Sequence, residues 1–295
     1  MTKRVKVLSM EKSNLKTEKI PITVLVITKN EEESLARCLE SVSAFAEVIV
    51  IDSQSTDRTS EIAKTHNAKV VEFLWDGAYP KKRQWCIDTL DISHDWILWL
   101  DADEALTTEF IRDVEQLANN NQSFCGYFVS SGYIFDGHNL NYGLKNNKLA
   151  LYNKSMVAFP LVDDLDIEGM GEIEGHYQPV KLDEYKNKQI GQINSPILHY
   201  AYEDKSAWRA RHERYAKWES QMIIRDVYPK DPVFWREWLK KMTRKSCVRA
   251  YLMFLYSYIF KLGFLDGKAG MSFALSRKSY YDVVLRNLRI LKSEE

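Results

Sequence analysis

Residues 96–104, WILWLDADE, join an apolar run to three carboxylates, and they carry the strongest signal for chemistry in the chain. The run 96–100 predicts a strand buried on both faces, as in a parallel sheet covered by helices. Asp101, Asp103 and Glu104 follow at the edge where open α/β sheets bind ligands. Two Asp with one residue between them can hold Mg²⁺ or Mn²⁺, and that ion can hold a diphosphate. An isolated pair of this kind is also compatible with a solvated turn in which Glu104 begins the next helix.

Two earlier strands end in polar side chains of their own. Residues 22–28 predict the first strand, followed by Thr28, Asn30 and Glu31, and residues 47–52 predict the second, which ends at Asp52. Further strands are predicted over 69–73, 125–135 and 149–153, and helices over 31–43, from Ser55 or Thr56 to 66, 81–90 and 108–119. Strands that alternate with helices favour a parallel sheet with right-handed crossovers, which gathers these strand ends at one edge.

The glycine-rich phosphate loops of other nucleotide-binding folds are missing from the sequence. It contains no GxGxxG after the first strand and no GxxxxGK[ST]. A Rossmann dehydrogenase and a P-loop nucleotidase are therefore not expected. A bound nucleotide has to be held by Thr28, Asp52 and the acidic turn.

Four linked segments resemble the N-terminal half of the inverting family-two glycosyltransferases with the GT-A fold. More narrowly, they look like the bacterial branch that adds sugars to lipopolysaccharide core, capsule or related glycolipids. The segments are VITKNEEESLARCLESV, EVIVIDSQSTDRTSEIAKTHNAKVVE, WDGAYPKKRQWCID and DWILWLDADEALT, which cover about residues 22–118. SPILHYAY at 195–202 and GFLDGKAG at 263–270 also resemble that branch.

The resemblance implies a UDP-sugar donor. Asp52 then pairs with the uracil imide, and the loop with Thr28, Asn30 and Glu31 lines the nucleoside. Lys82 or Arg83 lies near the diphosphate.

The same resemblance implies a metal site. Asp101 and Asp103 correspond to the DxD motif that binds Mn²⁺ or Mg²⁺, with Asp103 as the direct ligand. His199 corresponds to the late histidine that completes the metal site in many GT-A enzymes. A lone histidine after an apolar run is also commonly a hydrogen-bonded structural residue.

An acidic segment supplies the candidates for a general base. Inverting transfer is a single displacement, so the acceptor hydroxyl has to lose a proton, usually to a carboxylate. The family's His-Glu pair is not reproduced, because Met170-Gly171-Glu172 has no histidine before the glutamate. We expect Glu172 to be the base, with Glu174 and Asp164 as the next candidates. The alternative is that these acids form a solvated loop shielded by neighbouring lysines.

Charge divides the chain into two parts. From Lys205 onward there are 20 Lys and Arg against 9 Asp and Glu, although the whole chain has 41 of each kind. Residues 233–249 interleave aromatic and aliphatic side chains with Lys and Arg, which is typical of a helix lying on an anionic membrane. Residues 251–264 continue this pattern with aromatics. The alternative is a helical appendage packed on the core. Nucleic acid is not an expected partner, because the pocket is acidic and no RNA-binding motif is present.

The sequence therefore predicts an α/β protein of GT-A fold, with a mostly parallel sheet flanked by helices. The expected parts are a flexible lead-in (1–20), a nucleotide-sugar half (21–120), an acceptor half (121–204) and a basic helical region (205–295). The expected acceptor is a lipid-linked glycan, lipopolysaccharide or capsule. Scattered cysteines, a polar N-terminus and a longest apolar stretch of only 251–260 favour a cytoplasmic protein peripheral to the inner face of the cytoplasmic membrane.

Two other classes remain open. A nucleotidyltransferase shares the sheet topology and the magnesium, but it normally has a glycine- and arginine-rich loop after the first strand, which TKNEEES lacks. A non-catalytic membrane-docking scaffold with a degenerate sugar-nucleotide fold is the third reading, and metal-dependent turnover of a UDP-sugar separates it from an enzyme.

Overall fold

A single mixed sheet forms the centre of the molecule. The computed structural model describes residues 18–118, 123–135, 137–167, 171–172, 174, 177–200, 205–227 and 234–294. The strands of this sheet are β1 (Ile20–Thr28), β2 (Phe45–Asp52), β3 (Lys69–Glu72), β4 (Trp96–Asp101), β5 (Glu104–Leu106), β6 (Phe124–Phe135), β7 (His138–Asn139), β8 (Asn147–Asn153) and β11 (Gln189–His199). Within the described residues the order is β3-β2-β1-β4-β8-β6-β11-β5, with β7 beside β6. β9 (Val157–Ala158) and β10 (Val180–Lys181) form a separate pair.

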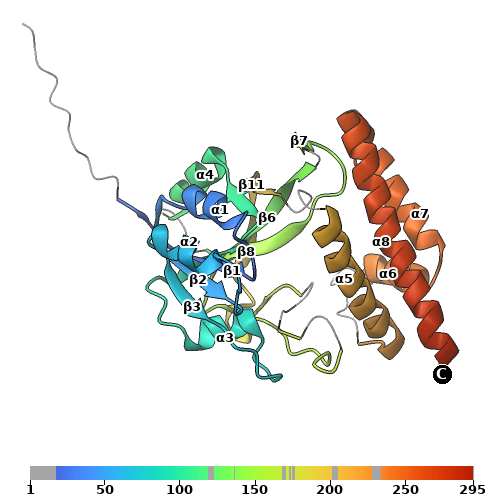
Figure 1. Cartoon of the computed structure of the whole chain (residues 1–295), viewed down its shortest axis with the longest axis horizontal. Coiled ribbons are helices and arrows are strands. Elements are labelled where there is room, and N and C mark those ends of the chain that lie inside the picture. The colour runs from blue at the N-terminus through green and yellow to red at the C-terminus, as the bar shows by residue number, and fades with distance from the viewer. Residues whose placement is uncertain are drawn as a thin grey trace, which may run out of the picture.

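The first half of the sheet is parallel and the second half is mixed. β3, β2, β1 and β4 are all parallel, whereas β8 is antiparallel to both β4 and β6. Helices α1 (Leu35–Ser41), α2 (Thr59–Thr65), α3 (Lys82–Thr89) and α4 (Thr108–Ala118) connect and flank these strands (Figure 1). The predicted α/β architecture is confirmed.

Alternating side chains of the central strands build two cores. On one face Val24 and Val26 of β1 pack with Leu98 and Leu100 of β4, in the cluster that α1 and α4 cover. On the other face Leu25, Ile97 and Trp99 join Cys86 of α3. A strand buried on both faces needs an unbroken apolar run, and β4 has one.

Strand register brings the polar ends to one edge. Thr28 of β1 lies beside Asp52 of β2, and Ile27 lies beside Asp101 of β4. β11 reaches the same edge, because His199 pairs with Glu104 of β5 in an antiparallel ladder. This edge therefore collects side chains that are almost a hundred residues apart in the sequence.

Most predicted elements of the first half are present within a few residues of their expected bounds. Five of the described strands, β5, β7, β9, β10 and β11, were not predicted. The helix predicted to begin at Ser55 or Thr56 begins at Thr59 instead, with Arg58 at its N-cap position, and the carboxylate of Asp57 accepts the Thr59 backbone N–H at 3.0 Å. Glu104 begins β5 and not a helix. The predicted lead-in lies mostly outside the described residues.

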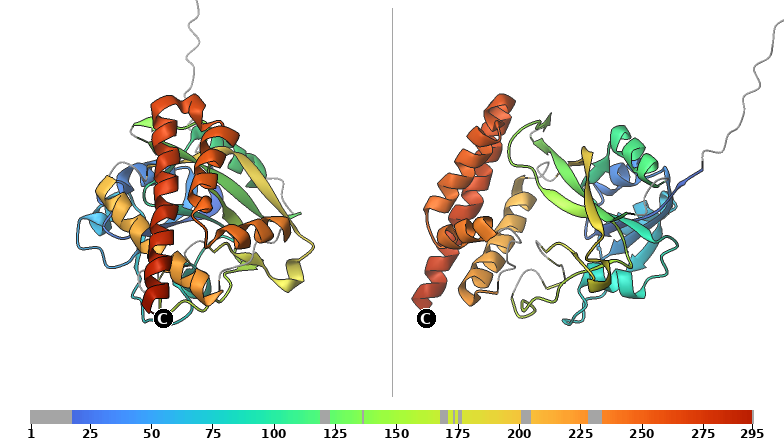
Figure 2. Two further views of the ribbon diagram at one scale, coloured as in Figure 1. Left: turned by 90° about the vertical axis from the view of Figure 1, so that its right-hand side faces the viewer. Right: turned by 180° about the vertical axis from the view of Figure 1, so that it is seen from behind.

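The C-terminal region forms a helical layer beside the sheet domain, and Figure 2 shows it from two further sides. Its helices are α5 (Lys205–Arg225), α6 (Phe234–Thr243), α7 (Val248–Leu255) and α8 (Gly267–Glu294). Between α7 and α8 lie a π-helical turn, η2 (Tyr256–Phe260), and a 3₁₀ turn, η3 (Gly263–Asp266). Among the described helices none alone has the length and apolarity to cross a membrane, although the bent pair Val248–Phe260 and Gly263–Ser293 meets that test together, at an angle of 73°.

Candidate active site

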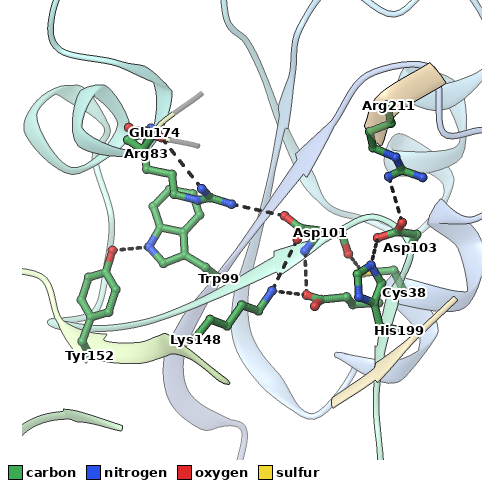
Figure 3. A network of polar contacts seen from close by, with 11 residues as sticks. Cys38, Arg83, Trp99, Asp101, Asp103, Lys148, Tyr152, Glu174, His199 and Arg211 are labelled. Atoms are coloured by element: carbon green, nitrogen blue, oxygen red, sulfur yellow. Dashed lines mark hydrogen bonds and ion pairs between the residues drawn. The ribbon is translucent and has the colours of Figure 1, made fainter. Parts of the chain in front are cut away.

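Asp103 lies between two basic side chains from distant parts of the chain. His199 Nε2 is 3.3 Å from its Oδ1, and the Arg211 guanidinium of α5 is 3.2 Å from its Oδ2 (Figure 3). Burial opposes ionisation of Asp103, but His199 and Arg211 outweigh it and hold the pKa of the carboxyl below its ordinary value. Burial also opposes ionisation of His199, but the neighbouring Asp103 carboxylate outweighs burial and raises the pKa of the imidazole above its ordinary value. The structure thus brings together the two residues predicted to share a metal.

Asp101 is the more open of the two aspartates. Its side chain is 41% exposed, with Arg83 at 3.3 Å and Lys148 of β8 at 3.5 Å. Lys148 also lies 2.5 Å from Glu104, which is only 1% exposed and accepts the backbone N–H of Asp101. Glu104 and Lys148 therefore fix the turn that carries the acidic pair.

The ends of β1 and β2 interlock through side-chain hydrogen bonds. Asp52 accepts the hydroxyls of Ser55 at 2.5 Å and Ser60 at 2.8 Å. Thr28 is buried and donates its hydroxyl toward Ile51 and Asp52. Asn30 has a φ of +56°, which turns the loop so that its side chain accepts the Thr56 N–H at 2.8 Å. The predicted nucleoside-binding residues form one rigid corner.

Glu31 lies in the same corner, nearer to the acidic pair. Its backbone N–H donates to the Thr59 hydroxyl at 2.8 Å. Burial, together with repulsion from Asp103 and Asp101, raises the pKa of Glu31 to about 7. The site therefore holds a carboxyl that changes its charge near neutral pH.

The predicted base segment crosses the start of α3. Glu174 is 2% exposed, and its Oε1 accepts the backbone N–H groups of Arg83 at 2.7 Å and Gln84 at 3.0 Å. It thus caps the helix. Glu172 is 22% exposed and lies 3.1 Å from Lys82, which is itself buried. Of these two predicted bases, Glu172 has the side chain more exposed to solvent, whereas Glu174 is occupied in capping α3.

Asp164 is fully enclosed. Lys81 lies 2.7 Å from its Oδ1, with side-chain exposures of 1% and 0%. The Tyr79 hydroxyl also donates to Oδ1, and the Tyr177 hydroxyl and the Trp218 indole N–H donate to Oδ2. A carboxylate that already has these four donors is a structural anchor between the α3 loop and α5, so we do not retain Asp164 as a base.

Sequence reasoning missed Lys148, Arg211 and Lys81. Lys148 and Arg211 reach the acidic turn from β8 and α5, at 44 and 108 residues' separation from their partners. No local pattern marks such contacts, although a lysine in the apolar strand 147–153 is a usable hint. Within the described residues no three His, Cys, Asp or Glu side chains already converge as a metal cage.

The strand order, the acidic turn after β4 and the adjacent histidine together define a domain of the GT-A class. Residues 23–163 match the family model described as glycosyl transferase family 2. A mannosyltransferase from Pyrobaculum calidifontis has a similar fold, with a TM-score of 0.51 and 12% identity over 92% of this chain and 87% of that one.

Curated relatives carry glycosyltransferase names. An uncharacterised glycosyltransferase of Rickettsia typhi is 30% identical over 191 residues, which cover 57% of this chain and 63% of the relative. The lipopolysaccharide core biosynthesis glycosyltransferase LpsC of Rhizobium meliloti is 28% identical over 117 residues, covering 38% and 42%. The chain thus spans less than two thirds of the length of each of these relatives.

Proposed function

We propose that the protein is a metal-dependent, inverting glycosyltransferase that moves a sugar from a UDP-sugar to a lipid-linked or lipopolysaccharide-type glycan. The observation that carries this proposal is the contact between Asp103 and His199 at the carboxyl edge of the sheet, with Asp103 two residues after Asp101 and within the segment that matches the family 2 model. The name of the Rhizobium relative, a lipopolysaccharide core enzyme, supports the class of acceptor.

The residues present fit a divalent ion. Asp103 offers a carboxylate and His199 an imidazole whose Nδ1 has no hydrogen-bond partner and whose Nε2 faces Asp103. Oxygen and imidazole ligands suit Mn²⁺, and oxygen ligands suit Mg²⁺. Asp101, exposed at 41%, is available to the ion or to its waters. When bound, such an ion neutralises the departing diphosphate.

The chain's own groups orient the donor. Asp52, held by two hydroxyls, has carboxylate oxygens to accept the uracil imide N–H at the corner beside Thr28 and Asn30. Arg83 lies beside Asp101 and can face a diphosphate there. Lys82 is buried against Glu172, so we assign it to holding that glutamate and not to the phosphates.

Glu172 is the base in this proposal. The acceptor oxygen attacks the anomeric carbon, the bond from that carbon to the diphosphate oxygen breaks, and the acceptor proton passes to the Glu172 carboxylate. Lys82, 3.1 Å away, orients the Glu172 carboxylate.

One substitution tests the assignment. Asp103→Ala should abolish UDP release from a UDP-sugar in the presence of acceptor and manganese, while the protein still unfolds cooperatively without metal, at a lower midpoint because the contacts to His199 and Arg211 are lost. Calorimetry should show that manganese no longer strengthens UDP binding. Transfer at the unchanged rate by this variant would defeat the proposal. Metal-dependent UDP-sugar binding without any turnover by the unchanged protein would favour the scaffold.

We also propose that the protein works in the cytoplasm, on the inner face of the membrane where lipid-linked acceptors are built. The support is α6, which exposes Lys240 and Lys241 beside Trp238 and Met242. Arg244 is buried and pairs with Glu237 at 2.9 Å, so it belongs to the fold and not to the membrane face. Charge reversal of Lys240, Lys241 and Lys245 should weaken binding to anionic vesicles severalfold. Unchanged co-sedimentation of this variant with the vesicles would contradict the proposed membrane association.

A further inference from the structure

The helix α7 and the turn η2 turn their large apolar side chains outward. Six side chains spaced by one and four residues make a stripe along this segment, and each is between 40% and 74% exposed: Tyr251, Leu252, Leu255, Tyr256, Ile259 and Phe260. This spacing defines one face of a helix. We name this stripe the apolar ridge. A surface helix of a soluble protein normally shows the reverse pattern, so the ridge needs a partner.

The fully buried positions of the same segment are small residues. Ala250 and Ser257 are buried at 1% and 0%, and Gly263 follows them. A Cβ on Gly263 would meet the Ser257 carbonyl oxygen at 2.8 Å, and one on Gly270 would meet the Gly263 carbonyl oxygen at 1.9 Å. The segment GFLDGKAG therefore allows η3 and α8 to cross closely. The close packing on this side leaves the bulky side chains facing out.

The ridge is fastened to the sheet domain by backbone hydrogen bonds. Asp266 accepts the N–H groups of Asn141 at 3.2 Å and Tyr142 at 2.9 Å. The Gly143 N–H donates to the Lys261 carbonyl at 2.9 Å, and the Leu144 N–H to the Ser257 hydroxyl at 3.2 Å. Residues 141–144, which connect β7 to β8, therefore move with the ridge.

The charge around the ridge selects its partner. From Trp238 to Leu265 the sequence has six Lys and Arg and no Asp or Glu. Two of these six cations, Arg244 and Arg249, pair with glutamates outside this stretch, which leaves a net of four positive charges. A second copy of the chain would set these cations against each other, whereas an anionic lipid surface would neutralise them. Residues 248–260 extend for only about 20 Å at 1.5 Å per residue, which is shorter than the hydrocarbon core of about 30 Å.

The second helix of the bent pair, α8, is covered by other parts of the protein on one face. Phe273, Val284 and Leu288 of α8 are each at most 2% exposed, and α8 packs along α5 (Figure 1). A helix committed to this packing is not available to lipid on that face. The ridge is therefore suited to lying in a membrane surface and not to crossing it.

We propose that the apolar ridge inserts into one leaflet of an anionic bilayer, with Lys261 at the level of the lipid phosphates, and so fixes the 141–144 connection against the membrane. This inference deepens the membrane part of the proposed function. It assigns the main hydrophobic contact with the membrane to α7 and η2, in addition to the electrostatic attraction of α6. Phe264 and Leu265 of η3, exposed at 45% and 52%, extend the apolar surface beyond Lys261.

Vesicle co-sedimentation of the full chain tests the inference. The double variant Ile259→Ser/Phe260→Ser removes two side chains that are 50% and 74% exposed. The control Leu74→Ser/Leu161→Ser removes two that are 70% and 79% exposed on other segments. On vesicles of phosphatidylglycerol and phosphatidylcholine we expect the ridge variant to bind at least about tenfold more weakly, because each apolar side chain contributes strongly to insertion. The control should bind like the unchanged protein.

Three results would overturn the inference. One is equal binding by the ridge variant and the control. Another is that the ridge variant loses vesicle binding and also has a lowered unfolding midpoint, and that Phe260→Leu, which keeps an apolar side chain, loses vesicle binding as well. The third is a dimer in light scattering that the ridge variant converts to monomer while vesicle binding is unchanged, since a second copy then covers the ridge. Asp103→Ala should bind vesicles normally, so failure of the catalytic proposal leaves this test intact.

Discussion

At the scale of single residues, Asp103 shows how neighbouring side chains compensate the negative charge of the site in the absence of ligand. Its carboxylate faces His199 on one oxygen and Arg211 on the other. An arriving divalent ion has to displace part of this positive charge, and a diphosphate offers the Arg211 guanidinium new acceptors close by. His199 and Arg211 thus lower the pKa of the Asp103 carboxyl in the state without metal.

Glu31 gives a pH-dependent prediction at this scale. Its pKa in the folded protein, about 7, lies above its ordinary value of 4.5. The folded state therefore binds this proton more tightly, so the stabilisation is complete below about pH 4.5 and is lost as pH rises through about 7. Glu31→Gln should have little effect on stability at pH 5 and should stabilise at pH 8 by about 2 kcal/mol or less, since a pKa unit corresponds to about 1.4 kcal/mol and partial exposure screens the charge.

The measurement is denaturant unfolding of both proteins at pH 5 and pH 8 without divalent metal. A conservative control is Glu32→Gln, because Glu32 follows directly in the same loop and its carboxylate pairs with the exposed Arg58. An equal change at the two pH values would show that Glu31 does not titrate in this range.

At the scale of elements, the local sequence pattern was sufficient to predict those strands and helices whose own residues determine them. β4 has the predicted bounds, because five consecutive apolar residues fit only a strand buried on both faces. β5 has three residues and exists because β11 pairs with it from about ninety residues away. β11 contains Pro196, and its register shifts between Ile193 and Ile197, so its alternation is broken. Such long-range pairing leaves no periodic signal.

The same limit applies to the site. Asp101, Asp103 and His199 could be picked out, because strand ends and a known pattern marked them. The partners of the acidic turn, Lys148 and Arg211, are set by packing between elements and could not. The helix α3 supplies a prediction here, because its first turn carries Arg83 and is capped by Glu174.

Glu172 and Glu174 should differ when each is changed to glutamine. Glu172→Gln should lower kcat by about 10²–10⁴-fold with little change in stability, because it removes a proton acceptor that is partly open to solvent. Glu174→Gln keeps an acceptor oxygen but loses the charge at the N-terminus of α3, which should destabilise by about 1 kcal/mol and reduce kcat far less. Steady-state kinetics and thermal unfolding measure both. The reverse order of kcat losses would make Glu174 the base.

At the scale of the whole molecule, the C-terminal helices are bound to the sheet domain at several separate points. Arg211 of α5 reaches Asp103, and Trp218 of the same helix donates to Asp164. Further along α5, Glu219 accepts the Tyr280 hydroxyl of α8 at 2.6 Å and lies 2.7 Å from Arg249 of α7. The helix α5 therefore joins the helix that carries the apolar ridge to the acidic turn, through Glu219 and Arg211 at separate positions along it.

Asp266 tests whether this joining matters for work at a membrane. Asp266→Ala removes the acceptor of the Asn141 and Tyr142 N–H groups and should loosen the 141–144 connection, while the ridge itself is unchanged. We expect vesicle binding within about twofold of the unchanged protein, because the buried apolar side chains supply it. UDP-sugar hydrolysis without acceptor should also persist, since the donor corner lies on other strands. Transfer to a lipid-linked acceptor in vesicles should fall severalfold, because the acceptor half is no longer held against the bilayer. A parallel fall in hydrolysis would mean instead that Asp266 supports the fold of the donor site.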